Sequence, residues 1–222
     1  MQKGEYSDMA NYNKGKDTQK NILAASSRLF YKQGYNETTT RQIAEEAGIN
    51  LGLIKYYFDS KADIAYHIYL KIRNIYDEAF SAQGYSDIEL FLLSSAAELK
   101  LCFTNRHFLI FYRDIYRESK LVETLHSHVT ESLNKNSKKS ESYKILASAC
   151  LTSIKPSLVN QYISAGDEHF SNETYIRFYL EQQTYFNDIR KSASVCDYIM
   201  QELDKYELDL NEGFQPVIRK LR

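Results

Sequence analysis

Apolar residues recur along most of the chain at spacings of three and four positions, which is the pattern of amphipathic helices. The first such pattern begins at Asp17, and Gly34 follows its last apolar residues, where a left-handed residue commonly ends a helix. Residues 1–16 are polar and lack the periodicity, so we expect them to form a mobile arm.

Two short helices are predicted directly after Gly34. Thr39 and Gln42 have the spacing of a capping box, which predicts a helix start near residue 40, and Gly48 breaks that helix. Asn50 is a favourable N-cap for a second helix. One face of this second helix must pack inward. The face that stays exposed carries Leu51, Gly52, Leu53, Lys55 and Tyr56. Two short helices joined by a tight glycine turn form a helix-turn-helix pattern.

The remaining chain reads as a series of helices without repeats. A capping box of Ser60 and Asp63 opens a long helix that runs to about Phe80. Pro156 must kink the pattern at 141–165 or begin a new helix near Ser153. The other helical patterns cover 86–103, about 120–135, 173–190 and 193–208, with an aromatic segment at 105–117, loops at 134–142 and 166–172, and a frayed basic terminus after Gly213 and Pro216.

The predicted fold class is therefore all-α. We expect a flexible arm at 1–16, an N-terminal three-helix helix-turn-helix domain at 17–62, and a C-terminal helical bundle at 63–222. Composition agrees, because 8 Gly and 2 Pro in 222 residues are too few for the many tight turns of a sheet or barrel. The hydrophobic fraction of 43% excludes a disordered chain.

Targeting and redox signals are weak. The chain holds no apolar run of membrane-spanning length, and its first twenty residues lack the apolar stretch of a secretory signal. Its 3 cysteines have no metal or redox spacing, so we expect free thiols in a reducing cytoplasm. The net charge of −1 gives no hint of a partner, although residues 1–62 hold 9 Lys/Arg against 7 Asp/Glu, a balance that permits DNA binding.

Residues 38–64, TTTRQIAEEAGINLGLIKYYFDSKADI, resemble the DNA-binding signature of the TetR/AcrR family of transcriptional regulators. The signature runs Thr-x-Arg-x-Ile-Ala, then Ala-Gly-Val-Ser, then Gly-x-Leu-Tyr-x-Tyr-Phe-x-x-Lys-x-x-Leu. The residues that match it are Thr39, Arg41, Ile43, Ala44, Ala47, Gly48, Gly52, Tyr57, Phe58, Ser60 and Lys61. With the preceding helix, the resemblance covers about residues 17–65.

The resemblance implies a dimeric, ligand-responsive repressor that binds a palindromic operator in double-stranded DNA and inserts the second motif helix into the major groove. It implies phosphate contacts for Tyr57 and Lys61, and Arg41 can reach a phosphate or a base edge. Two alternatives stay open, because Tyr57 can be a core wedge and Arg41 a solvated surface charge. The full predicted DNA-binding set is Thr39, Arg41, Asn50, Leu51, Gly52, Leu53, Lys55, Tyr56, Tyr57 and Lys61.

The chain departs from the family pattern on the predicted reading face. Many relatives carry Lys and Thr where this chain has Leu51 and Leu53. A leucine cannot donate hydrogen bonds to bases, but it can pack on the thymine methyl group, the apolar feature of the major groove. We therefore predict an operator half-site rich in thymine.

The aromatic residues beyond the motif are candidates for a ligand pocket, although most aromatic stripes at helical spacing are core. A site among them would suit a hydrophobic or flat aromatic effector, including a cationic one. The predicted ligand-binding residues are Tyr66, Phe103, Phe108, Phe111, Tyr112, Tyr162 and Tyr179. The predicted homodimer seam at 173–208 contains Ile176, Leu180, Ile189, Ile199 and Leu203, unless these cover the protomer's own core.

Other function classes are less well supported. The sequence shows no nucleophile elbow, phosphate-binding loop, dinucleotide fingerprint or zinc-ligand motif, so we predict no enzyme activity, no cofactor and no metal site. The pairs Asp63 with His67 and Glu123 with His126 share helix faces and keep a metal-responsive regulator open as an alternative. A helical interaction protein without DNA binding is the other alternative, and it fits the two leucine substitutions.

Overall fold

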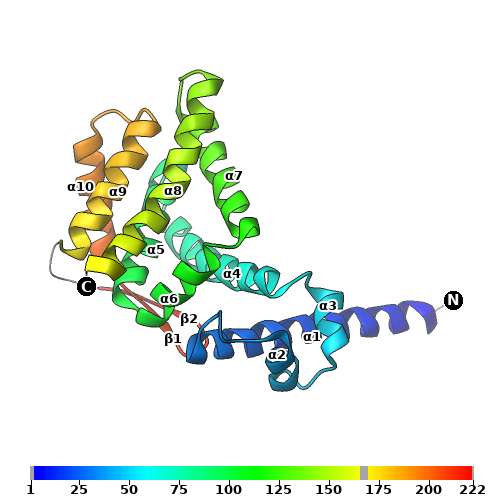
Figure 1. Cartoon of the computed structure of the whole chain (residues 1–222). Helices are drawn as coiled ribbons and strands as arrows, with labels where there is room; N and C mark the ends of the chain where they lie inside the picture. The colour runs from blue at the N-terminus through cyan, green and yellow to red at the C-terminus, as the bar shows by residue number, and fades with distance from the viewer. Residues whose placement is uncertain (1–2, 166–169, 222) are drawn as a thin grey trace.

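The computed structural model describes residues 3–165 and 170–221 of the chain. Figure 1 shows α1, α2 and α3 at one end of the molecule and the helices from α5 onward at the other, with α4 between the two groups. The helices are α1 Lys3–Gln33, α2 Thr40–Glu46, α3 Leu51–Tyr57, α4 Lys61–Ser81, α5 Asp87–Thr104, α6 Arg106–Ile115, α7 Ser119–Asn136, α8 Glu141–Ala165, α9 Asn172–Phe186 and α10 Ser192–Asp204.

Helix α1 begins at Lys3, so residues 3–16 of the predicted mobile arm are helical. This segment contains no proline to stop a helix, and it is polar throughout. Its polar sequence carries no apolar stripe, which is the signal that periodicity detects. Figure 1 shows why no stripe is needed, since this part of α1 projects past α2 and α3.

The two short helices form where the sequence predicts them. Thr39 and Gln42 make the capping box at the start of α2, with the Thr39 side chain accepting from the Gln42 amide at 3.2 Å. Gly48 has a φ of +65°, the left-handed conformation that lets the chain reverse between α2 and α3. The helix-turn-helix arrangement is thereby confirmed.

Helix α4 is capped differently from the predicted box. The Ser60 hydroxyl accepts from the Asp63 amide at 3.1 Å, as expected. The Asp63 carboxylate accepts from the Asp59 amide at 3.1 Å rather than from Ser60. Helix α4 then runs to Ser81 and buries Ile64, Ile68 and other apolar side chains in one core shared by the two groups of helices.

Pro156 does not divide its segment, because α8 runs through it from Glu141 to Ala165. Proline has no N–H, so the carbonyl of Thr152 one turn earlier loses its usual helical partner. The Tyr116 hydroxyl donates to that carbonyl at 2.6 Å. A residue distant in sequence thus satisfies the group that the proline leaves unpaired, and the alternative of a new helix near Ser153 is wrong.

The C-terminal segment is a β-hairpin, although its sequence predicts a helix to 208 followed by a frayed end. Strands β1 Tyr206–Asn211 and β2 Gln215–Lys220 pair antiparallel. In β1, buried residues alternate with exposed ones, and the Asn105 side chain donates to the Leu210 carbonyl at 3.0 Å. The aromatic ring of Phe214, in the turn, stacks against Phe111 in the core. The hairpin is therefore a packed part of the bundle.

The ends of α9 and the adjoining loop also differ from the predicted limits. Helix α9 ends at Phe186 rather than near residue 190, and its N-cap is Ser171. Residues 166–169 of the predicted loop at 166–172 lie outside the described residues. Within the described ranges, no helix is both long and apolar enough to cross a lipid bilayer.

Candidate nucleic-acid interface

Helix α3 separates its residues into a buried face and an exposed face. Ile54 is 2% exposed and anchors the helix in the core, as does Phe58 directly after it. On the other side, Tyr56 is 78%, Leu51 46% and Leu53 38% exposed. Large apolar side chains left this open are a surface that normally meets a partner. The predicted exposure of this face is confirmed.

The N-terminus of α3 is held by a side-chain cap. The Asn50 carboxamide oxygen accepts from the Gly52 amide at 2.9 Å. A Cβ added at Gly52 would lie 3.4 Å from that oxygen, an ordinary van der Waals contact. The Asn50 side chain therefore fixes the start of the helix through the Gly52 amide.

Two predicted contact residues lie on α2 beside this face. Thr39 is exposed but its side chain is occupied as the helix cap. The Arg41 side chain is 82% exposed and reaches Glu45 at 3.4 Å. Ion pairs this exposed contribute little, so the guanidinium can exchange Glu45 for a phosphate at small cost.

Tyr57 lies between α3 and α1. It is half-buried, and its ring meets the Tyr56 ring edge-on with 4.9 Å between centroids. A Cβ added at Gly15 would lie 3.3 Å from the Tyr57 hydroxyl oxygen, so α1 passes close to it. The absence of a side chain at Gly15 gives Tyr57 its place, a contact between distant residues that sequence periodicity does not reveal.

The Lys61 ammonium is engaged inside the protein. It donates to the carbonyl oxygens of Tyr35 at 2.8 Å and Thr38 at 2.9 Å, and it lies 4.2 Å from the centroid of the Tyr35 ring. Burial lowers the pKa of Lys61. These contacts hold the turn between α1 and α2, so in this structure Lys61 is a structural residue rather than part of the exposed face.

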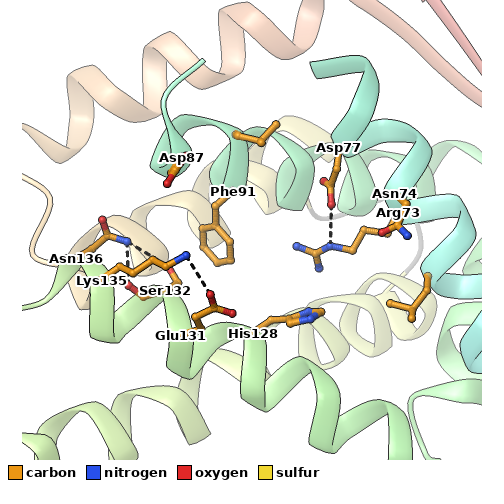
Figure 2. Close-up of a pocket in the computed structure, with 12 residues that line it drawn as sticks. Arg73, Asn74, Asp77, Asp87, Phe91, His128, Glu131, Ser132, Lys135 and Asn136 are labelled. Carbon is orange, nitrogen blue, oxygen red and sulfur yellow. Dashed lines mark hydrogen bonds and ion pairs between the residues drawn. The ribbon is translucent and has the colours of Figure 1, made fainter. Parts of the chain in front are cut away.

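A second candidate site is a cavity of about 730 Å³ between α4, α5 and α7. Its volume falls in the range of about 300–1,000 Å³ that small-molecule sites occupy. Figure 2 shows the Phe91 ring and the Arg73 guanidinium pointing into it, with His128 along one wall. The complete lining is Leu70, Arg73, Asn74, Asp77, Asp87, Leu90, Phe91, His128, Glu131, Ser132, Lys135 and Asn136.

None of the seven predicted ligand residues lines this cavity. Tyr66 packs beside Lys120, and Phe103 packs with Tyr162 between α5 and α8. The other aromatic side chains are buried core: Phe108, Phe111, Tyr112 and Tyr179. Of the seven, Tyr179 comes nearest, at a void of about 20 Å³ that shares Arg73, Phe91 and His128 with the cavity.

Nine of the twelve residues that line the cavity are polar or charged, and their charges are largely paired. The Lys135 ammonium lies 3.0 Å from Glu131 at the exposed rim, and the Arg73 guanidinium lies 3.7 Å from Asp77. Burial, and then the positive charge of Arg73, lowers the pKa of His128, so its imidazole is neutral at pH 7. A wall of this kind can orient a small polar molecule.

Behind the cavity wall lies a buried ion cluster. Glu98 accepts from the Lys155 ammonium at 2.8 Å and from the Tyr69 hydroxyl at 3.0 Å, and Arg73 lies 3.7 Å from it. Burial raises the pKa of Glu98, but the charges of Lys155 and Arg73 outweigh burial, so that the pKa is lowered overall. Arg73 therefore belongs both to the core and to the cavity wall.

Two hydrogen-bonded contacts join the start of α7 to the helix-turn-helix part and to the first turn of α4, which directly follows that part. The Tyr35 hydroxyl donates to the Glu118 carboxylate at 2.7 Å. The Lys120 ammonium donates to the Asp63 carboxylate, which also has His67 at 3.7 Å. We call these two contacts the interdomain latch. Asp63 is thus paired with Lys120, and no group of three metal-ligating side chains occurs among the described residues.

The sequence pattern predicts the exposed face of α3, but it does not predict the cavity or the latch. Arg73 and Asp77 sit one turn apart on α4, and their charges interrupt the buried series Ile72 and Tyr76. Charged residues directly beside core positions are the sequence signal that could have indicated the cavity. Helix periodicity alone does not show which other helix faces them.

The comparisons with known proteins agree with this geometry. Residues 22–68 match the sequence model described as "Bacterial regulatory proteins, tetR family". The chain is 45% identical over 56 residues to the HTH-type transcriptional regulator HbdR of Aromatoleum sp. (strain CIB), covering 25% of this chain and 23% of HbdR. It is 32% identical over 71 residues to the HTH-type transcriptional regulator TtgR of Pseudomonas putida, covering 32% and 34% of the two chains.

These matches therefore span about a quarter to a third of the curated relatives. A fold likeness extends further along the chain. The crystal structure of RolR in complex with resorcinol aligns over 85% of this chain and 95% of RolR, with a TM-score of 0.56 at 14% identity. At that identity the likeness concerns the fold alone.

Proposed function

We propose that this chain, whose N-terminal domain is that of a TetR/AcrR-family regulator, binds a palindromic operator as a homodimer and represses transcription until a small-molecule effector releases it. The observation that carries the proposal is the exposed face of α3, where Leu51, Leu53 and Tyr56 are open to solvent on a helix fixed by the core. Residues 17–62 are the proposed DNA-binding domain, and residues 63–222 the proposed effector and dimer domain.

The proposed DNA contacts divide by chemistry. Leu51 and Leu53 pack on thymine methyl groups in the major groove, and Tyr56 reaches a base edge or a phosphate. Lys55 and Arg41 contact phosphates, which fixes the register without reading sequence. Tyr57 and Lys61 act indirectly, since their described contacts hold α1, α3 and the intervening turn in place.

The proposed dimer surface differs from the predicted seam. Ile176, Leu180, Ile199 and Leu203 are at most 3% exposed and cover the protomer's own core, and Ile189 is half-buried. The apolar side chains left open lie elsewhere on α8 and α9, which pack side by side: Ile145, Leu146, Ile163, Phe178 and Tyr185. An exposed apolar stripe shared by two neighbouring helices supports pairing with a second copy through α8 and α9.

The proposed effector site is the cavity between α4, α5 and α7. Helix α7 contributes His128, Ser132 and other wall residues, and its N-terminal end carries the interdomain latch. An 18-residue helix is a rod of about 27 Å, so a shift at the cavity reaches the latch directly. A coupling free energy of about 1–3 kcal/mol between the two sites is enough for substantial release.

Selection of bound duplexes from random double-stranded DNA tests the proposed function. We expect a palindrome whose half-sites lie one helical turn apart, about 34–36 Å, with thymines at the positions nearest Leu51 and Leu53. Half-sites rich in G and C would contradict the reading by leucine. Recovery of no enriched sequence would favour the alternative of an interaction protein without DNA binding.

A salt titration of the selected duplex supplies the control for that experiment. Lys55 on α3 and Lys71 on α4 are both exposed lysines. Lys55→Ala is expected to reduce the log–log salt slope by about one, because one phosphate contact is lost, whereas Lys71→Ala leaves it unchanged.

The interdomain latch has its own test. Tyr35→Phe keeps the buried ring but removes the hydroxyl that donates to Glu118, which should lower the opening free energy of the α3 amides by about 1–2 kcal/mol in native-state hydrogen exchange. Glu46→Gln is the matched control, because it breaks the Arg28–Glu46 ion pair inside the DNA-binding domain and leaves the latch intact. Equal α3 protection in Tyr35→Phe and the unmodified protein would show that the latch does not couple the domains.

A further inference from the structure

We propose that the cavity between α4, α5 and α7 binds a small aromatic carboxylate, with its carboxylate on Arg73 and His128 and its ring on Phe91. This inference rests on the proposal that the cavity is the effector site. It differs from the hydrophobic or cationic effector that the aromatic content of the sequence predicts, and the reason lies in the charges behind the wall.

The first step is the charge balance around Arg73. The side chains of Glu98 and Lys155 are 8% exposed and that of Arg73 is 13% exposed, so the buried cluster holds two cations and one carboxylate. Both oxygens of Glu98 already have close donors, Tyr69 at 3.0 Å and Lys155 at 2.8 Å. The second cation, Arg73, has its two nearest carboxylates, Glu98 and Asp77, at 3.7 Å each, so neither lies within hydrogen-bond distance of it.

The second step is the geometry of the guanidinium. Arg73 reaches Glu98 and Asp77 at 3.7 Å in each case, beyond the distance of a normal hydrogen bond. The Tyr69 hydroxyl also lies beside it. Figure 2 shows the guanidinium at the cavity with its Nε on the side of Asp77, while one terminal nitrogen lies 3.7 Å from Glu98. A planar guanidinium with donors facing a cavity matches a carboxylate, which can accept two parallel hydrogen bonds from it.

The third step is the remaining wall. His128 on α7 faces the same space, and a neutral imidazole can donate one N–H to the second carboxylate oxygen. The Phe91 ring projects into the middle of the cavity, whose lining also includes Leu70 and Leu90. These apolar groups suit the body of an aromatic acid, since aromatic rings pack offset or edge-on with a gain beyond area burial.

The acidic residues of the wall favour a cationic ligand instead. The experiment must therefore distinguish a cationic ligand from a carboxylate. Glu131 is engaged by Lys135 at 3.0 Å, and Asp87 is exposed at the rim in the first turn of α5. Asp77 is closer to the proposed carboxylate and repels it. An anionic ligand is favoured if the buried guanidinium of Arg73 dominates the electrostatic potential inside the cavity. A cationic ligand is favoured if these carboxylates dominate it.

Three probes of nearly the same shape separate the readings: benzoate, neutral benzamide and cationic benzamidine. Each is titrated into the DNA-free full chain by calorimetry, where a ligand of this size reaches about millimolar affinity. We expect benzoate to bind at least about tenfold more tightly than benzamide, because it forms charge-assisted hydrogen bonds. Equal binding of the two, tighter binding of benzamidine, or no saturable benzoate binding would overturn the proposal.

Variants locate the binding. Arg73→Gln should abolish the preference for benzoate over benzamide, but it also disturbs the buried cluster. Asn74→Asp therefore serves as the second variant, because it adds a carboxylate to the wall at an exposed position and should weaken benzoate several-fold. Asn134→Asp makes the same change on an exposed part of α7 away from the cavity wall and should leave binding unchanged. Unaltered benzoate affinity in Asn74→Asp would overturn the proposal.

The result is separable from the proposed function, because operator binding is measured on the selected duplex without any probe. Operator binding combined with no benzoate preference would leave the regulator assignment standing and remove the carboxylate. A clear preference for benzoate in a chain that selects no duplex would support the carboxylate site and contradict the regulator assignment.

Discussion

Leu146→Glu on α8 is expected to convert the proposed homodimer into a monomer and to weaken binding to the proposed operator by about 100-fold or more. Leu146 is 69% exposed, so the substitution removes almost no packing within the protomer. In the proposed dimer, the new carboxylate is buried against the apolar side chains of the second copy without a partner, which is strongly unfavourable. A monomer also loses the effective concentration that couples the two half-sites, a factor of about 10²–10⁴.

Sedimentation at micromolar concentration measures the first effect, and anisotropy of the labelled operator the second. Leu221→Glu is the matched control, because Leu221 is 52% exposed and lies beyond β2, where its amide donates to the Lys205 carbonyl, rather than on α8 or α9. It should change neither the sedimentation coefficient nor the affinity. A Leu146→Glu protein that still sediments as a dimer would show that the copies pair through another surface.

The helix-turn-helix part could be predicted from sequence because local interactions define it. The Thr39 cap, the left-handed Gly48 and the Asn50 cap are each set by residues within three positions of one another. The exposure of Tyr56 follows from the burial of Ile54 on the opposite face. Short-range chemistry of this kind is readable without knowing the rest of the fold.

The C-terminal hairpin also has a local strand pattern in its sequence, but the same segment fits a helical pattern. In Tyr206–Asn211, buried and exposed residues alternate strictly, which is the period of a half-buried strand. Apolar residues of the preceding helix continue into it at helical spacing, which hides the change of period. The Gly213 turn and the packing of Phe214 on Phe111 then fix the hairpin through contacts distant in sequence.

The cavity could not be predicted because its wall combines three helices. Arg73, Phe91 and His128 come from α4, α5 and α7, and each by itself reads as an ordinary surface or core residue. The aromatic residues drew attention because of their number, yet Phe108, Phe111 and Tyr112 fill the core. Aromatic content indicates packing volume, whereas a cavity depends on which polar side chains the helices bring together.

Lys155→Met is expected to lower the free energy of unfolding by about 3–5 kcal/mol at pH 7, because it leaves the buried Glu98 carboxylate without its closest cation. Methionine keeps the length and apolar contacts of the lysine stem, so the loss reports the charge. Lys144→Met on the same helix is the matched control. Its pair with Glu141 is 3.9 Å long and that carboxylate is exposed, so the expected change is within about 0.5 kcal/mol.

The pKa of Glu98 determines how the stability loss of the Lys155→Met protein changes with pH. In the unmodified protein the pKa of Glu98 is lowered, so its contribution to stability is present above the unfolded value of about 4.3 and is lost as pH falls through the folded value. Without Lys155, burial dominates and the pKa should rise above the unfolded value. The Lys155→Met protein should then lose stability as pH rises through that raised pKa, so its deficit is largest at pH 7 and shrinks toward pH 4.

Urea denaturation between pH 4 and 8, at one protomer concentration, measures both effects through the midpoint at constant m-value. The double variant Glu98→Gln with Lys155→Met has no buried carboxylate, so it should be more stable at pH 7 than Lys155→Met alone and should lack its pH dependence. A deficit that stays the same across this range would mean that Glu98 remains ionised, with Arg73 and Tyr69 alone holding its charge in the core.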